Sequence, residues 1–248
     1  MRHSTSAYIR EFHNFVYLLD FNSIISAKNL KRCSLRLENH NECLKDAIQD
    51  AMPKIAKGIP ELDIPILDPF TTESQDVTYG NAFVSGKLSM KNVNTYGSSR
   101  ARINSVKSTP TEGRHRLEVG VSFPRIYIEG EYKAEGRVND FKLGGKGYFN
   151  VSMEGVKTVW DITGRIENDR WVIEHFIMLP EVEKMSVYFD DLFNGNDNIN
   201  IVARSFINEY WPLFYNELLP ITAGEWDKQL TDFTNLAFSK LSYSKLFA

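Results

Sequence analysis

The two cysteines are the first residues whose type and spacing could do chemistry. Cys33 and Cys43 are the only cysteines among the 248 residues, and they would close a short loop. A disulfide between them would stabilise the fold by about 2–4 kcal/mol by restricting the unfolded chain. We expect that bond if the protein is secreted, whereas a cytosolic protein would keep two free thiols. His40 is the one histidine beside them, too few ligands for a structural zinc site.

The other reactive residue types form no catalytic pattern. The histidines lie apart, with no pair at helical ligand spacing: His3, His13, His40, His115 and His175. His175 alternates with apolar residues, which favours a structural or surface histidine over a base. The chain has no Gly-x-Ser-x-Gly or His-Glu-x-x-His motif, and Gly147 follows Gly145-Lys146 where a phosphate-binding loop needs Ser or Thr. We therefore expect no enzymatic activity and no cofactor.

Three further polar segments are interpreted as structural or as modification sites. The glycines of residues 144–147 are expected to form a hairpin turn. Asp190-Asp191 lacks the spaced carboxylates of a calcium loop, so we expect turn and cap chemistry there and no metal. Asn150-Val151-Ser152 is a glycosylation sequon, usable if the chain is secreted and Asn150 is exposed.

The composition is typical of a soluble globular protein, with 42% hydrophobic and 25% charged residues. The formal net charge of -3 argues against nucleic-acid binding or a polybasic membrane surface, because both need a concentrated positive patch. No segment has the roughly 18 to 20 apolar residues of a membrane span. We expect a monomer with no nucleic-acid partner and no stable membrane insertion.

The N-terminal 32 residues have no strong period and are predicted to be a leader or a flexible arm. A mostly apolar run from Phe15 to Ala27 follows basic residues, but Asp20 interrupts it, so the signal sequence is degenerate. Cleavage after Ala27 would make the protein secreted and extracellular. Residues 33–248 contain no repeat and no hinge-like linker, which predicts a single domain.

Helical spacing starts after the cysteine loop. Between Glu42 and Lys57 apolar residues recur every three or four positions, which predicts a helix with a kink or second turn at Pro53. The segment 58–69 contains three prolines, and we expect an extended strap along the core with no helix. Toward the C-terminus, residues 199–218 and 226–241 again have helical spacing, and Pro212 and Pro220 should bend or interrupt it.

The middle of the chain has the pattern of strands. Apolar residues alternate with polar ones in residues 117–123, 156–162 and 171–179, and polar turns separate these segments. Nothing between Val77 and Phe189 alternates strands with helices, which argues against a parallel doubly wound sheet. The fold class is therefore α+β, with a short helix, a long antiparallel sheet and a long bent C-terminal helix.

Several motifs in a fixed order resemble the insect takeout and haemolymph juvenile-hormone-binding family. They are the two-cysteine loop before a helix, the run Gly58-Ile59-Pro60-Glu61-Leu62 with Ile64-Pro65 and Leu67-Asp68-Pro69, the run Phe189-Asp190-Asp191-Leu192-Phe193-Asn194-Gly195, and Lys240-Leu241-Ser242-Tyr243-Ser244-Lys245-Leu246-Phe247. The resemblance extends from Cys33 to the end of the chain. The chain cannot form the second disulfide of the juvenile-hormone carriers, so it is more similar to the takeout branch.

The resemblance implies a secreted protein in which a strongly curved antiparallel sheet wraps a long C-terminal helix and encloses a hydrophobic tunnel. It implies a soluble carrier for a juvenile-hormone-like terpenoid, a fatty acid or a similar lipid. Burial of apolar surface, at about 25 cal/mol per Å², would hold such a ligand without charge pairing. The cysteine loop and the strap would then close or frame one end of the tunnel.

Candidate tunnel walls are apolar residues of the strands and of the C-terminal helices. They are Val119, Val121, Phe123, Trp160, Ile162, Phe176, Met178, Phe206, Tyr210, Phe214, Trp226 and Phe233. The alternation leaves open which strand face points inward. If these residues instead fill a plain core, the alternative is a surface protein-interaction or signalling module with the same fold.

Overall fold

The computed structural model describes residues 33–80, 84–138, 141–193 and 195–247. The leader predicted for residues 1–32, with its cleavage site after Ala27, lies outside the described residues. Among the described residues, no helix is both long enough and apolar enough to cross a membrane.

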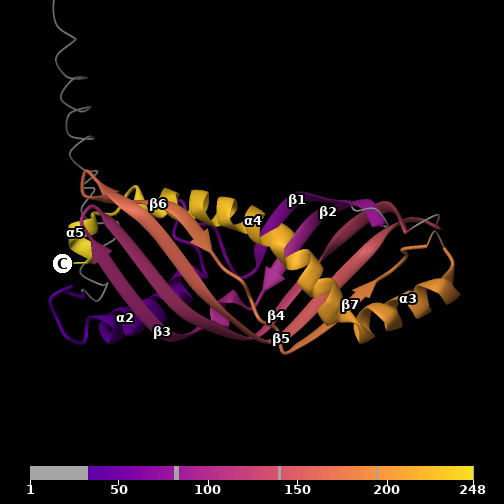
Figure 1. Ribbon diagram of the computed structural model, residues 1–248, viewed down its shortest axis with the longest axis horizontal. Coiled ribbons are helices and arrows are strands. Elements are labelled where there is room, and N and C mark those ends of the chain that lie inside the picture. The colour runs from indigo at the N-terminus through magenta and orange to yellow at the C-terminus, as the bar shows by residue number, and fades with distance from the viewer. Residues whose placement is uncertain (1–32, 81–83, 139–140, 194, 248) are drawn as a thin grey trace, which may run out of the picture. The chain divides into compact units, whose positions relative to one another are not determined.

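The described residues form one helix, then a seven-stranded antiparallel sheet, then the C-terminal helices (Figure 1). The helices are α2 (His40–Ile55), α3 (Asp197–Glu209), α4 (Trp211–Phe238) and α5 (Tyr243–Leu246). The strands are β1 (Phe70–Gly80), β2 (Val84–Tyr96), β3 (Arg102–Thr111), β4 (Arg114–Val138), β5 (Phe141–Glu167), β6 (Arg170–Ile177) and β7 (Lys184–Phe189). The predicted α+β class, with its antiparallel sheet and C-terminal helix, is confirmed.

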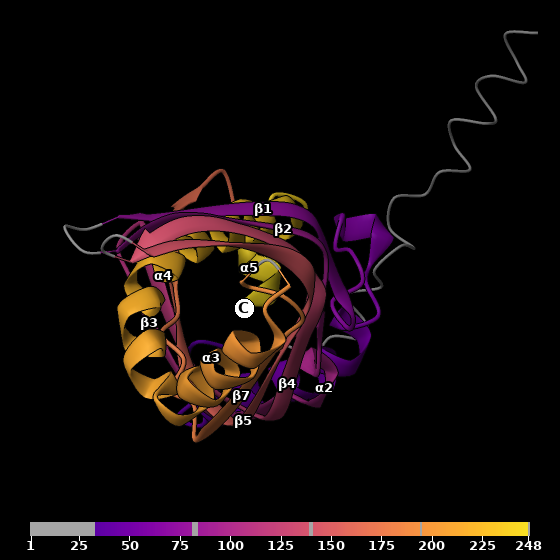
Figure 2. The same ribbon diagram turned by 90° about the vertical axis from the view of Figure 1, so that its right-hand side faces the viewer.

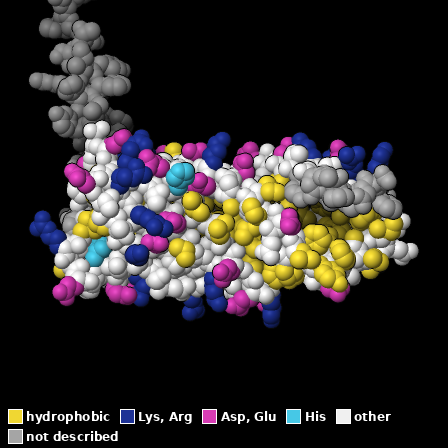
Figure 3. All heavy atoms as spheres, in the orientation of Figure 1, with side chains coloured by type: hydrophobic (Ala, Val, Ile, Leu, Met, Phe, Trp, Pro, Cys, Tyr) yellow, Lys and Arg dark blue, Asp and Glu magenta, His cyan; other side chains and the backbone are white. Residues whose placement is uncertain are grey.

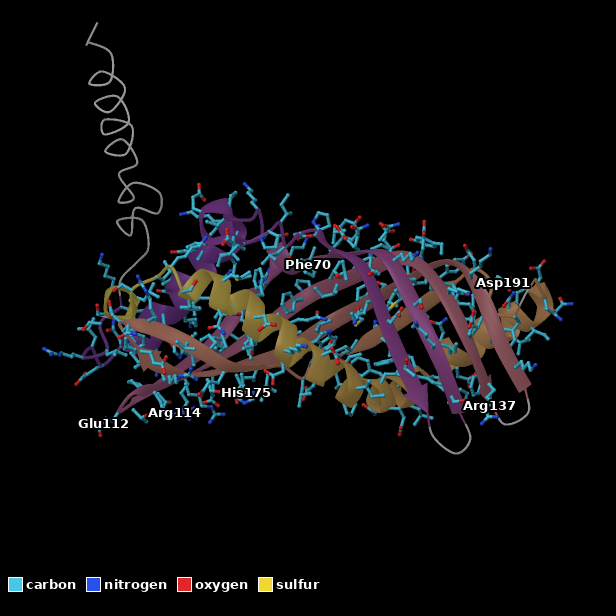
Figure 4. The ribbon with its side chains drawn as sticks, turned by 90° about the horizontal axis from the view of Figure 1, so that it is seen from above. Phe70, Glu112, Arg114, Arg137, His175 and Asp191 are labelled. Carbon is cyan, nitrogen blue, oxygen red and sulfur yellow. A yellow bond between two sulfur atoms is a disulfide. The ribbon has the colours of Figure 1, made fainter. Side chains whose placement is uncertain are left out.

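One long hairpin forms the middle of the sheet. β4 and β5 pair in a single register, from Arg114 opposite Arg165 to Val138 opposite Phe141. β3 and β2 follow one another along the other edge of β4, while β6 and β7 do so along β5. The hairpin therefore runs the length of the sheet, with Arg114 and Arg137 at opposite ends (Figure 4). The sheet curves through most of a ring, and α4 covers the remaining side (Figure 2).

The apolar face of the hairpin changes parity half-way along it. Odd-numbered residues of β4 are buried up to Val121, whereas from Gly130 on the even-numbered residues, such as Tyr132 and Ala134, are the more buried ones. The strand pairing skips Pro124 and Gly155 at this point, and Gly155 has a φ of 62°. That backbone conformation favours glycine and is common where a strand is locally irregular. A single pattern of alternating buried and exposed residues therefore does not hold along the whole of β4.

One half of the sheet carries a closely packed core, which we call the packed half. Its buried residues are Cys33, Leu44, Met52, Ala101, Ile103, Val106, Leu117, Val119, Val121, Ile162, Trp171, Ile173 and Phe247. They come from α2, from β3 to β6 and from the C-terminal end of the chain. The predicted disulfide between Cys33 and Cys43 is present, and Cys33 is completely buried. The disulfide therefore attaches the start of α2 to this core.

Two segments differ from the prediction. Pro60–Leu62 forms a 3-10 turn and Ile59 bridges Ile64, so residues 58–69 are not uniformly extended. Proline suits the first position of a helical turn because its φ is already fixed and its missing N–H is not needed there. The glycines of 144–147 lie inside β5 and form no hairpin turn. A Cβ at Gly145 would stand 2.0 Å from the Asp191 carbonyl oxygen, so glycine here allows a close backbone approach.

The prolines of the helices have unequal effects. Pro212 is at the start of α4, directly after the break at Tyr210, which confirms the predicted interruption. Pro53 and Pro220 lie within α2 and α4, and neither divides its helix. The C-terminal helix is consequently two helices, a short α3 and a long α4.

Three free strand edges are covered by helices through amide side chains. Asn235 of α4 accepts a hydrogen bond from Ile173 N and donates one to Ile173 O, both at 2.8 Å. Asn208 of α3 makes the same pair of bonds with Val187 on β7, also at 2.8 Å. On β3, Gln49 of α2 bonds Ala101 O and Ile103 N. Each amide completes the backbone hydrogen bonding of an edge that would otherwise be open to other chains.

Candidate functional site

The candidate site is a set of accessible apolar side chains on α3 and the start of α4. We call it the apolar stripe, and it comprises Ile199, Val202, Phe206, Tyr210 and Phe214, all of them exposed. The rings of Phe206, Tyr210 and Phe214 contact one another, with centroids 4.9 and 6.0 Å apart. In Figure 3, hydrophobic side chains gather on the half of the molecule where α3 and the first turns of α4 lie. A contiguous exposed apolar surface of this kind is typical of a binding site.

The opposite face of α3 is fixed to the sheet. Asn200 accepts hydrogen bonds from Leu192 N and Phe193 N, Arg204 donates to Phe189 O at 3.0 Å, and Asn208 holds Val187. Since these residues face the sheet edge, the apolar stripe is directed away from β7. Figure 2 shows α3 on the β7 side, with its other side toward the region that the sheet and α4 surround.

The sheet contributes a second apolar wall in the same half. Ile126 and Ile128 of β4 are paired with Met153 and Val151 of β5, and paired residues share a face of the sheet. Val187 of β7 is paired with Val151 and extends the row. All five side chains are half-buried. We call this part of the molecule, with the apolar stripe, the accessible half.

An aromatic row lies at the border between the two halves. Phe123, Trp160 and Phe176 come from β4, β5 and β6, with ring centroids 6.4 and 6.0 Å apart. All three are half-buried and pack on the core of the packed half. Beyond them the apolar positions of β4 change parity. The row therefore forms the floor of the accessible half.

Two of the hollows on the surface of the described residues have defined linings. One, of about 400 Å³, is lined by Asp68, Tyr96, Gly97, Ser99, Arg100, Arg125 and Tyr127. The other, of about 380 Å³, lies between β1 and α4 and is lined by Ser74, Gln75, Asp76, Val77, Thr78, Ile221, Thr222, Glu225 and Gln229. The second hollow follows the side of α4 that faces β1.

Comparisons with known proteins show the family to which this chain belongs. The model of the haemolymph juvenile hormone binding protein family matches residues 16–248. The chain belongs to this family. The crystal structure of Takeout 1 from Epiphyas postvittana superposes with a TM-score of 0.72 at 19% identity, covering 88% of this chain and 99% of that one. At this level of identity, the likeness shows that the two proteins share a fold. Lipopolysaccharide binding protein gives a TM-score of 0.30 at 15% identity, covering 75% of this chain and 37% of that one. No curated protein sequence matches the chain.

The twelve predicted wall residues fall into four groups. Val119, Val121 and Ile162 are buried in the packed half, and Phe123, Trp160 and Phe176 form the aromatic row. Phe206, Tyr210 and Phe214 belong to the apolar stripe. Met178, Trp226 and Phe233 are half-buried. The strand wall formed by Ile126, Ile128, Val151, Met153 and Val187 was missed, because only the parity change identifies it.

The buried histidine of the packed half is a structural residue. His115 is 2% exposed, and its ring nitrogens bond Ser108 Oγ at 2.8 Å and Tyr243 Oη at 3.0 Å. It stacks on Trp171 with centroids 4.9 Å apart. Burial lowers the pKa of His115 to about 4, so the imidazole is neutral at physiological pH. Its place is inside the core and away from the apolar stripe.

The remaining polar candidates also have structural partners. His175 is exposed and pairs with Asp227 at 2.9 Å. Asp191 accepts hydrogen bonds from Gly195 N, Asn200 Nδ2 and Phe193 N, and these bonds keep the pKa of its carboxyl below the usual range. Asp191 therefore makes the predicted turn, at the end of the molecule occupied by α3 (Figure 4). Among the described residues, no group of three or more His, Cys, Asp or Glu side chains could hold a metal ion.

Proposed function

We propose that this protein is a carrier that binds one small hydrophobic molecule in the accessible half. The ligand would lie between the apolar stripe of α3 and the strand wall of β4, β5 and β7, with the aromatic row at its inner end. This interior site is the hydrophobic tunnel implied by the sequence resemblance. The proposal agrees with the description of the family, which names juvenile hormone as a ligand.

The accessibility of the stripe carries the proposal. Phe206 is 53% exposed and Val202 is 67% exposed, although both lie on an apolar helix face directed toward the sheet's concave side. Covering such surface gains about 25 cal/mol per Å², which is enough for micromolar binding of a lipid-sized molecule without charge pairing. A filled-core interaction module would need these side chains buried, so this observation favours the carrier.

The ligand class follows from the surrounding chemistry. The stripe and the strand wall consist of aliphatic and aromatic side chains, which suits a mostly apolar molecule with few polar atoms. A juvenile-hormone-like terpenoid, a fatty acid or a similar lipid would meet that description.

The proposal extends to the location, oligomeric state and modification of the carrier. The Cys33–Cys43 disulfide supports secretion, because such bonds persist in oxidising compartments. We propose a secreted monomer in which residues 33–248 form one domain. Asn150 lies half-buried in β5, paired with Glu129 and Tyr188, and its glycosylation remains a prediction.

Lipid extraction and probe displacement test the proposal. Purified protein should release a bound apolar molecule to organic solvent, detected by mass spectrometry, and should bind the fluorescent probe N-phenyl-1-naphthylamine. Phe206→Asp should weaken probe binding by about tenfold or more, since a charge would be buried against the ligand. Leu37→Asp is the matched control, because Leu37 is equally exposed, at 52%, but lies in the cysteine loop.

The opposite results would overturn the proposal. The unmodified protein would then release no apolar molecule to organic solvent and would not bind the fluorescent probe. Equal weakening by Phe206→Asp and Leu37→Asp would place the probe outside the accessible half.

A further inference from the structure

The two long sides of α4 are attached to the sheet very differently. On one side Asp227, Thr231 and Asn235 recur every four residues, and Asp227 and Asn235 bond the backbone of β6. Asp227 accepts a hydrogen bond from Phe176 N at 2.8 Å, and Asn235 makes the paired bonds with Ile173. This side of α4 is therefore hydrogen-bonded directly to the edge of the sheet.

The other side of α4 faces β1 across the hollow of about 380 Å³. Ile221, Glu225 and Gln229, again four residues apart, line it from the helix. Two residues of α-helix turn by about 200°, so Glu225 and Asp227 lie on opposite sides of α4. Among the side chains that the structure describes, no hydrogen bond or ion pair connects α4 to β1. Thus α4 is hydrogen-bonded to the sheet at β6, whereas a groove separates it from the sheet at β1.

The edge of β1 differs from the other free edges in the same way. The edges of β3, β6 and β7 each receive an amide side chain, from Gln49, Asn235 and Asn208. Within the described residues, the outer edge of β1 receives none. An exposed strand edge is ordinarily covered, so its exposure beside a groove calls for a functional explanation.

The helix is also weakest where it borders the groove. Pro220 has no N–H to donate within α4, and Gly224 lies four residues further on. These are the two residue types least favourable in a helix interior, by about 3 and about 1 kcal/mol relative to alanine. A Cβ at Gly224 would meet no atom within 4 Å, so close packing does not require glycine there. The segment can therefore bend with little loss of packing.

We propose that the groove between β1 and α4 is the lateral portal through which the hydrophobic ligand enters and leaves. The inference rests on the proposed carrier function and adds the route to it. Movement of α4 away from β1 breaks no described hydrogen bond, whereas movement away from β6 would break several. Val77 and Ile221 supply apolar contacts along the route, and the polar residues around them keep the closed groove hydrated.

The charges at the groove favour neutral ligands. Glu225 and Asp76 both line it, and Lys87 compensates Asp76 with an ion pair at 2.6 Å. An uncompensated carboxylate at Glu225 repels a lipid carboxylate and leaves an ester or alcohol unaffected. The portal therefore selects neutral lipids over fatty-acid anions by their rate of entry.

Crosslinking across the groove tests the portal. The double variant Gln75→Cys/Gln229→Cys places one thiol on each side, and the native cysteines are already joined to each other. A flexible bis-maleimide then fixes α4 to β1, while the same variant blocked with N-ethylmaleimide carries similar groups without the bridge. His175→Cys/Thr231→Cys, bridged in the same way, fixes α4 on its β6 side and serves as the second control.

Stopped-flow fluorescence with N-phenyl-1-naphthylamine measures entry and exit. The bridge across the β1 groove should slow both rates by about tenfold or more, with the Kd nearly unchanged, because it acts on the route and spares the site. The blocked variant and the β6 bridge should behave like the unmodified protein. A pyrene-labelled fatty acid should enter more slowly than its methyl ester, and Glu225→Gln should reduce that difference.

Four results are decisive: two of them would overturn the portal, one the carrier function and one the charge selection. Unchanged rates after bridging would place the route elsewhere and leave the carrier function intact, whereas loss of all probe binding by the unmodified protein would remove the carrier function itself. A bridge formed mainly between two chains, seen as a covalent dimer, would assign the β1 edge to a subunit contact. Equal entry rates for the fatty acid and its ester would remove the charge selection.

Discussion

The packed half and the accessible half are built from the same two long strands but leave their apolar residues in different states. In the packed half, α2 and the C-terminal segment cover the sheet, and Val119, Val121 and Trp171 are each 1% exposed. In the accessible half, α3 is attached by its polar face, and its apolar stripe stays exposed. The comparison indicates that the way a helix attaches to the sheet decides the character of each half. Where a helix attaches by its polar face, its apolar face stays free for a ligand.

Matched truncations in the two halves should give the largest contrast. Trp171→Ala should reduce the free energy of unfolding by about 3–5 kcal/mol, because it removes a buried ring and leaves a cavity. Phe206→Ala should cost less than about 1 kcal/mol, because exposed surface residues contribute little. Urea unfolding of both variants measures this, and similar losses would abolish the distinction between the halves.

Acid should destabilise the packed half through His115. The pKa of His115 is lowered by burial to about 4, against 6.5 in the unfolded chain, so the unfolded state takes up the proton first. This contribution to stability is complete above pH 6.5 and is lost as the pH falls toward 4, by about 3 kcal/mol in total. Comparing urea unfolding of the wild type and His115→Gln across this range isolates the effect from that of the carboxylates. Parallel curves would show that His115 contributes nothing.

The disulfide should matter for stability more than for binding. Cys33→Ala/Cys43→Ala removes a bond with a sequence separation of 10, and we expect a loss of about 2–3 kcal/mol. Because the bond contacts the packed core, the affinity for a lipid probe should stay the same. Thermal unfolding and probe titration test the two parts, and weakened binding at full stability would instead support a bond that frames the ligand site.

The amide caps should show the smallest difference between the halves. Asn235→Leu leaves Ile173 N and O without partners in a buried setting, which should cost about 2–3 kcal/mol. Asn208→Leu does the same at Val187, where water can reach the strand edge, so about 1 kcal/mol is expected. The order of the two losses in urea unfolding is decisive, and a reversed order would show that the edge of β7 is the less accessible one.

The amino-acid pattern predicts the elements well and their faces less well. The strict alternation around Val119 and Trp160 predicts strands correctly, and the cysteine loop before α2 predicts the disulfide. The parity change at Pro124 and Gly155 has no counterpart in local alternation, because it depends on how both strands bend together. For that reason Ile128 and Val151 were not among the predicted wall residues.

Other features arise only from contacts between distant segments. Gly145 resembles a turn residue in the sequence, but it permits the approach of Asp191, 46 positions away in the printed chain. The amide caps are equally hidden, since Asn208 and Asn235 look like ordinary polar residues of an amphipathic helix. Their partners on β7 and β6 become adjacent only in the folded chain.

A crystal structure of the protein with a bound lipid tests the central claim most directly. The carrier account predicts continuous ligand density between Phe206 of the apolar stripe and Ile128 of the strand wall, ending at Trp160. Density confined to another surface, or an accessible half filled by its own side chains in the presence of saturating lipid, would contradict it.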